Sequence, residues 1–258
     1  MRGVSDSSSS WRHPGRTGAI LYAVLAAVLG GLTAAFSRLQ VARERGRREA
    51  AQRLPTGAII VISNHTSYAD GVLLALACRR LGRSLRLLAT SGIFRVPLLG
   101  GAMRKLGFIA VRRGAADASA ALDQAADALA HGEAVGLYPE GRLTRHPELW
   151  PERAKTGAVR LALRTGAPIV PLAMVGAHRV LARERRGRAL IRALVLRPRV
   201  HTKVGEPIDV RALVGTDSPS ADQIRAAADD VMARLVTLLE DLRGEMAPDP
   251  IGVERTPD

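Results

Sequence analysis

Between residues 57 and 245 the chain alternates short apolar runs with longer amphipathic stretches, and this alternation limits the possible folds more than any other feature. Short apolar runs bounded by turn residues are typical of buried strands, and they occur at residues 58–62, 85–90, 107–111, 134–138, 168–175 and 194–204. Helical patterns occur between or after them, at residues 71–81, 117–130, 156–165 and 220–244. This order indicates an α/β fold with a mixed, largely parallel central sheet flanked by helices.

An uncharged apolar segment at residues 18–37 follows a polar, serine-rich tail at residues 1–17, which is expected to be disordered. A helix of about 20 residues matches the thickness of a bilayer. We therefore expect residues 18–37 to form a membrane-anchoring helix. A helix that lies in the interface is one alternative, because Gly30 and Gly31 could bend it. A cleaved signal peptide is the other alternative.

The segment after the apolar run, residues 38–56, is rich in arginine and is expected to be a basic linker or helix. Because it is more basic than the N-terminal flank, the positive-inside rule predicts a cell-membrane protein with its main domain on the cytoplasmic side. That domain is expected at residues 57–245. The last residues, 246–258, are expected to be a disordered tail.

The chain is strongly basic, with a net charge of +14, which favours an anionic membrane surface or nucleic acid as a partner. Aromatic residues make up only 3%, so few rings are present to stack on bases, and we expect no nucleic-acid partner. Basic side chains are concentrated at residues 177–203, which are either a solvated face or a patch that contacts anionic lipid. The single cysteine, Cys78, excludes an intramolecular disulfide, and the sequence contains no cluster typical of a metal site.

A polar cluster that contains His65 and Asp70 directly follows the apolar run at residues 58–62 and precedes an apolar helix. Ligands bind at the carboxyl ends of strands in open α/β sheets. Histidine suits proton transfer near neutral pH, and an aspartate five residues later can orient its ring. The alternative is a purely structural role, in which His65 caps the helix or fills the core.

Three further clusters follow other strands. Glu140 and Gly141 follow the run at 134–138, where a carboxylate can bind a substrate hydroxyl and a glycine permits close backbone approach, unless they form an ordinary turn. Arg113 follows the run at 107–111, where a guanidinium suits phosphate, unless it is a solvated surface residue. The fourth cluster, residues 169–171, reads by itself as a buried strand.

Together and in this order, the four clusters resemble the motifs of the 1-acylglycerol-3-phosphate acyltransferase family. The first motif matches Asn64-His65-x4-Asp70 and the second matches residues 107–113, ending in Arg113. The third matches residues 138–141, with Tyr138 where phenylalanine is commoner, and the fourth matches residues 169–171. Residues 155–158, 166–168 and 205–208 also resemble the family, so the resemblance covers roughly residues 50–245.

The resemblance implies the glycerolipid acyltransferase fold and transfer of a fatty acyl group to the free hydroxyl of a lysophospholipid, most simply 1-acylglycerol 3-phosphate, to give phosphatidate. It implies that His65 is the general base and that Asp70 orients it. The residues expected to contact substrates are Asn64, Arg113, Glu140, Gly141 and Pro171. The donor is expected to be acyl-CoA or acyl carrier protein, with no cofactor and no metal.

One departure concerns the third motif, which in the family usually continues with Thr-Arg-Ser. Here Arg142 follows Gly141 directly, and Arg145 comes three residues later, so either could supply the expected guanidinium. This departure leaves another lyso-lipid or a glycolipid open as the acceptor. A non-catalytic lipid- or nucleic-acid-binding protein is the alternative from a different class.

Overall fold

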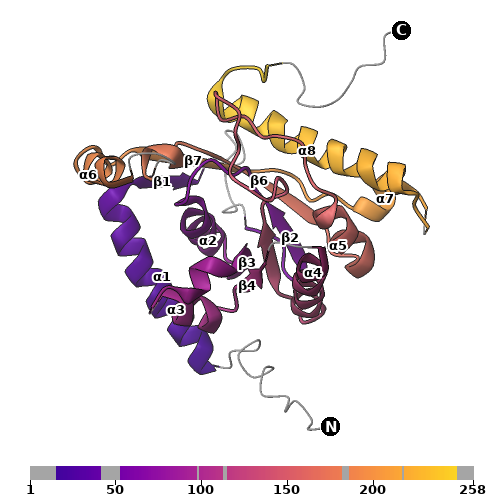
Figure 1. Cartoon of the computed structure of the whole chain (residues 1–258), viewed down its shortest axis with the longest axis horizontal. Helices are drawn as coiled ribbons and strands as arrows, with labels where there is room; N and C mark the ends of the chain where they lie inside the picture. The colour runs from indigo at the N-terminus through magenta and orange to yellow at the C-terminus, as the bar shows by residue number, and fades with distance from the viewer. Residues whose placement is uncertain are drawn as a thin grey trace.

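The computed structural model describes residues 16–41, 53–97, 99–112, 115–181, 186–216 and 218–248. Figure 1 shows a central sheet covered by helices on both faces. The sheet has seven strands in the order β1-β7-β6-β2-β5-β3-β4. The predicted terminal tails lie almost wholly outside the described residues.

The strands are β1 (Arg38–Val41), β2 (Ile59–Ile62), β3 (Leu85–Thr90), β4 (Ile109–Val111), β5 (Ala134–Leu137), β6 (Ile169–Val175) and β7 (Arg199–Val204). Every neighbouring pair is parallel except β6 and β7. The predicted mixed, largely parallel sheet is therefore confirmed. β2 lies at its centre, between β5 and β6, and both of its faces are buried.

The helices are α1 (Arg16–Phe36), α2 (Asp70–Arg80), α3 (Leu99–Lys105), α4 (Ala115–Ala130), α5 (Gly157–Thr165), α6 (Arg186–Leu196), α7 (Val210–Val214) and α8 (Ala221–Arg243), with 3-10 turns η1 (Ser91–Arg95) and η2 (Ala177–Arg179). Successive residues of β2 alternate between two cores. Ile60 and Ile62 join the core under α4, α5, α7 and α8. Ile59 and Val61 join the core under α1, α2 and α3.

Helix α8 shows how local sequence fixes a boundary. Ser220 accepts a hydrogen bond from the amide of Gln223, whose side chain bonds back to Ser220 N. This capping box satisfies two amides that a helix start would otherwise leave unpaired. At the other end, Gly244 has a φ of 70°, a conformation that glycine adopts without strain. The predicted final helix, residues 220–244, is thereby confirmed.

The N-terminal region differs from the prediction in two ways. The apolar segment does form a helix, α1, but no helix among the described residues is both long and apolar enough to cross a membrane. The expected linker or helix at residues 38–56 begins instead with strand β1, which pairs with β7. Leu39 and Val41 alternate with Arg38 and Gln40, and this period of two is the strand signal that the surrounding arginines conceal.

A second difference concerns the predicted strand at residues 194–204. Its first part is the end of helix α6, and strand β7 begins only at Arg199. Pro198 separates the two elements, because proline disfavours helical backbone in the residue before it. The described part of the basic segment at 177–203 thus includes η2, helix α6 and most of strand β7.

Candidate active site

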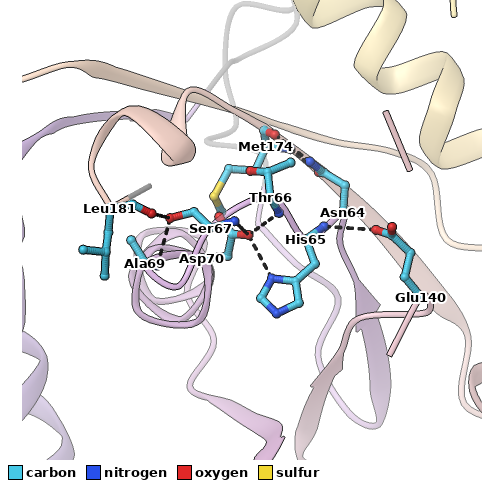
Figure 2. Close-up of polar contacts among 9 residues, drawn as sticks. All are labelled: Asn64, His65, Thr66, Ser67, Ala69, Asp70, Glu140, Met174 and Leu181. Carbon is cyan, nitrogen blue, oxygen red and sulfur yellow. Dashed lines mark hydrogen bonds and ion pairs between the residues drawn. The ribbon is translucent and has the colours of Figure 1, made fainter. Parts of the chain in front are cut away.

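The predicted polar cluster follows the carboxyl end of β2, which lies in the middle of the sheet. Figure 2 shows its side chains together with Glu140. Residues 63–69 leave the strand, and α2 starts at Asp70. β5 ends beside β2, so residues 138–141 reach the same edge. The first and third motif segments are therefore neighbours although they are far apart in sequence.

His65 and Asp70 form a hydrogen-bonded pair. The distance between His65 Nδ1 and Asp70 Oδ2 is 2.9 Å. The Asp70 side chain is 1% exposed, whereas that of His65 is 21% exposed. Figure 2 shows the second ring nitrogen of His65 on the side away from Asp70. One ring nitrogen is thus held by a buried carboxylate, and the other is free to exchange a proton with a bound molecule.

The backbone of the same loop also holds Asp70. Its Oδ2 atom accepts hydrogen bonds from the amides of Thr66 at 2.6 Å and Ser67 at 2.7 Å. The hydroxyl of Ser67 donates to the carbonyl of Leu181 at 2.7 Å. These bonds fix the carboxylate before any substrate binds, which is what an orienting group requires.

Tyr138 packs against one face of the His65 imidazole. Its ring stacks on the ring of His65, with centroids 3.9 Å apart and planes inclined by 11°. The third motif had identified Tyr138 only as a departure from the family pattern. The stacking partner depends on β5 lying beside β2, and sequence spacing carries no information about that contact.

Glu140 lies close to His65 but contacts its backbone. Glu140 Oε1 accepts from His65 N at 3.2 Å, and Oε2 accepts from Glu152 N at 3.0 Å. The residue is buried, and burial raises its pKa to about 7, although the two backbone bonds act in the opposite direction. Both oxygens are therefore occupied by the protein, and the carboxylate ties the two motif segments together.

Gly141 forms the turn that follows. Its amide donates to Tyr138 O at 2.9 Å, and its φ of 68° is readily adopted by glycine. A side chain here would also meet Lys155, since a Cβ atom would lie 3.0 Å from its Nζ. The exposed amine of Lys155 thus lies beside the turn, and it forms no ion pair within the described part of the chain.

Asn64 joins the active-site loop to β6. Its side-chain amide donates to Met174 O and accepts from Met174 N, both at 2.9 Å. The predicted substrate contact of Asn64 therefore has to compete with two backbone bonds. Pro171 is buried farther back in β6, where Gly205 packs close to its ring, and its register partner is Ile62. The structure thus places Pro171 within the sheet and not at the edge with His65.

The arginines of the motifs lie in different surroundings. Arg113 falls outside the described residues, and the strand before it, β4, ends at Val111. Arg142 bonds to Glu152 at 2.9 Å in an ion pair on the surface. The backbone amide of Arg145 donates to the same carboxylate. Glu152 therefore holds Arg142, whereas the guanidinium of Arg145 stays exposed.

Two other kinds of chemistry, attack by the Cys78 thiol and catalysis by a metal ion, find no support among the described residues. Cys78 is buried in α2, and burial raises its pKa to about 12, so the thiol stays protonated and does not serve as a nucleophile. Within the described ranges, no group of three or more histidine, cysteine or acidic side chains could hold a metal ion. The chemistry that the described site offers is proton transfer by His65.

Comparisons with known proteins identify the family to which the chain belongs. The family model described as Acyltransferase matches residues 45–175. The chloroplastic 1-acyl-sn-glycerol-3-phosphate acyltransferase BAT2 of Brassica napus is 30% identical over 125 residues, which cover 47% of this chain and 34% of that protein. A 1-acyl-sn-glycerol-3-phosphate acyltransferase of Borreliella burgdorferi is 28% identical over 119 residues, 45% of each chain. The chain thus matches less than half of the length of these two curated relatives.

Among solved structures, the 1-acyl-sn-glycerophosphate acyltransferase PlsC of Thermotoga maritima superposes with a TM-score of 0.64. The superposition covers 92% of this chain and 86% of that one, at 18% sequence identity. It therefore shows that the two chains share a fold.

Proposed function

Because the chain belongs to the acyltransferase family, we propose that it transfers a fatty acyl group from an acyl thioester to the free hydroxyl of 1-acylglycerol 3-phosphate, giving phosphatidate for phospholipid synthesis. The observation that carries the proposal is the pair formed by partly exposed His65 and buried Asp70, at 2.9 Å. The names of the two curated relatives above support this acceptor. The donor thioester is acyl-CoA or acyl carrier protein.

The reaction needs one base and no protein nucleophile. His65 takes the proton from the acceptor hydroxyl through the ring nitrogen that faces away from Asp70. The oxygen then attacks the thioester carbonyl, and the tetrahedral intermediate expels the thiolate. Asp70 holds the ring in one tautomer and stabilises the imidazolium that forms. The thiolate, or the solvent, finally recovers the proton from His65.

Recognition of the acceptor phosphate is assigned to two cations of the chain. Arg113, which follows β4, and Lys155, which lies beside Gly141, are the residues proposed to bind it. Asn64 and Gly141 shape the surrounding backbone, whereas Pro171 lies within the sheet. Glu140 holds His65 in place through its amide and so acts on the acceptor indirectly.

Contact with an anionic membrane surface is proposed for helices α1 and α6, which contact each other near the C-terminal end of α1 (Figure 1). Ile20, Val24 and Val28 form an exposed apolar row on α1. Helix α6 exposes a second apolar group with basic residues nearby: Ile191, Leu194, Val195 and Leu196, with Arg188 and Arg192. Arg197 donates to Ala34 O at 2.6 Å, so the ends of the two helices are joined.

An apolar face edged by arginines matches the chemistry of an interfacial helix on anionic lipid. We place this surface against the cytoplasmic leaflet of the cell membrane. Liposome flotation tests it: the protein should float with anionic vesicles, and the double variant Ile191→Asn, Val195→Asn should stay unbound. Met246→Asn, which changes another exposed apolar residue, serves as the control. Equal flotation of the double variant and the control would refute the membrane assignment.

The enzymatic proposal is tested by following thiol release from acyl-CoA in the presence of lysophosphatidate. His65→Ala should lose about 10²–10⁴-fold in rate, which is the usual contribution of a general base. His131→Ala, at the far end of α4, is the matched control and should keep its activity. Near-normal turnover by folded His65→Ala would disprove the mechanism. A panel with a neutral monoacylglycerol, a lyso-ornithine lipid and a glycolipid would identify the acceptor.

A further inference from the structure

Three buried polar atoms around the His65–Asp70 pair have no hydrogen-bond partner in the described structure. They are Ser63 Oγ, Asp70 Oδ1 and Tyr138 Oη. Buried polar groups in native proteins are nearly always bonded, either to protein or to ordered water, so each exception needs an explanation. None of the three atoms takes part in the contacts described above, which use Asp70 Oδ2 and the ring of Tyr138.

The three side chains share one face of the sheet. Ile59 and Val61 of β2 face the core under α2, so Ser63, two residues farther on, faces the same side. Tyr138 packs against this core as well. Ser63 N donates to Leu137 O at 3.4 Å, which places Ser63 beside the residue before Tyr138.

Asp70 approaches these two residues from above, because it is the first residue of α2, which covers this face. The ring of Tyr138 already lies 3.9 Å from that of His65, the partner of Asp70. The side chains that carry the unpartnered atoms therefore come from the end of β2, the end of β5 and the start of α2, on the same face of the sheet.

Electrostatics define which atom is the donor. Burial is the main cause that raises the pKa of Tyr138 well above its usual range, and the charge of Asp70 adds to it. The phenol therefore keeps its proton and can donate, whereas Asp70 Oδ1 can only accept. The hydroxyl of Ser63 can do either. A buried water typically has about three such partners.

We propose that Ser63, Asp70 and Tyr138 hold one internal water beneath the catalytic pair, and that Tyr138 is a positioning residue for His65 and Asp70. Its ring supports the imidazole by stacking, and its hydroxyl acts on Asp70 through the water. Asp70 Oδ2 then accepts hydrogen bonds from the His65 ring and the loop amides, while Oδ1 accepts a hydrogen bond from the water. The water site is independent of the proposed function, whereas the positioning role of Tyr138 in acyl transfer rests on the proposed function.

Other titratable groups face this site and remain the same in each variant below. Glu140 lies on the β5 side, and the charge of Asp70 contributes to its raised pKa. His178 belongs to η2, and burial lowers its pKa most, while Asp70 acts in the opposite direction. Cys78 is on α2 and stays protonated. Any change caused by a substitution at Ser63 or Tyr138 is therefore measured against a constant background.

The matched variants are Tyr138→Phe, which keeps the ring and removes the hydroxyl, and Ser63→Ala, which removes another water partner. Either change should leave Asp70 a stronger acceptor for His65. The Nδ1 proton resonance of His65 should move downfield in both variants, and the acid limb of the pH–rate profile should move up by about half to one pH unit. The double variant should shift no farther than the larger single variant, because both act through the same water.

A high-resolution crystal structure of the full chain completes the test. The wild type should contain a water bonded to all three atoms, and Tyr138→Phe should lose it. A dry wild-type site, or variants whose resonance and pH profile equal those of the wild type, would overturn the proposal. The crystal and resonance measurements need no substrate, so a protein that holds the water but transfers no acyl group would refute only the proposed function.

Discussion

Two polar segments reach the same edge of the sheet, yet they use their buried carboxylates in opposite ways. In residues 63–70, after β2, Asp70 points to the ring of His65. In residues 138–152, after β5, Glu140 points to backbone amides at His65 and Glu152. The first carboxylate orients a reacting group, and the second joins two loops.

The position of an acidic residue at a strand end therefore does not by itself determine its role. What decides the role is the set of donors that occupies the carboxylate oxygens. Glu140 has its two oxygens filled by amides, and its segment is further anchored by Thr144 N, which donates to His65 O at 2.8 Å. Arg243 of α8 stacks 4.0 Å over Trp150 in the same segment. Residues 138–152 thus support residues 63–70 structurally.

The largest expected difference between the two carboxylates is in turnover. Asp70→Asn should lower kcat by about 10²–10⁴-fold, because the ring loses its orienting charge and its tautomer. Glu140→Gln keeps one backbone acceptor and should cost less than about tenfold. Thiol release at saturating substrate measures both. Equal losses would mean that Glu140 also takes part in the chemistry.

The next effect concerns stability. Asn64→Ala leaves the amide and carbonyl of Met174 unpaired in a buried strand, which should lower the free energy of unfolding by about 2–5 kcal/mol. Urea unfolding provides the measurement. Gln40→Ala, which removes an exposed amide from β1, should change it by less than about 0.5 kcal/mol. A stable Asn64→Ala protein with impaired substrate binding would instead support the direct substrate contact predicted from the family motif.

A smaller effect should appear in the pH dependence of stability. The pKa of Glu140 rises on folding from 4.5 to about 7, so its contribution is fully present below pH 4.5 and is lost as the pH rises through about 7. The loss amounts to at most about 3 kcal/mol. Glu140→Gln should remove this slope from unfolding curves measured between those pH values. If the stability of the two proteins depended on pH in the same way, burial would not raise the pKa of Glu140.

The smallest effect is expected in the KM for the acceptor. Lys155→Ala should raise the KM for lysophosphatidate about tenfold with little change in kcat, since one charged contact to phosphate is lost. Lys105→Ala, at the end of α3, is the control and should behave like the wild type. If a neutral monoacylglycerol suffers the same increase in KM, Lys155 does not bind the phosphate.

Much of this architecture was predictable because its signals are local. The apolar runs of β2, β5 and β6 are short and bounded by turn residues, which is typical of buried strands. The spacing of His65 and Asp70 lets them meet across the start of one helix. Strand β1 was missed because Leu39 and Val41 supply only two buried-side positions among arginines. Its pairing with β7 is a tertiary contact that outweighs the local composition.

The contacts that give each site residue its environment were not predictable. Asn64 reads as a motif residue in sequence, and only the approach of β6 reveals that Met174 uses both ends of its amide. Tyr138 reads as a replacement for phenylalanine, and only the pairing of β2 with β5 brings its ring onto His65. Long-range strand order, which single-sequence patterns do not encode, decided both outcomes.

The bond between Asn64 and Met174 also has a consequence for biosynthesis, because the two residues are 110 positions apart. As the chain leaves the ribosome, the histidine loop emerges long before the strand that fastens it. Closing so long a loop is slow compared with forming local helices. Any chain interrupted before β6 would carry His65 and Asp70 on a segment that lacks its bonds to Met174, so the proposed activity requires that most of the sheet has been made.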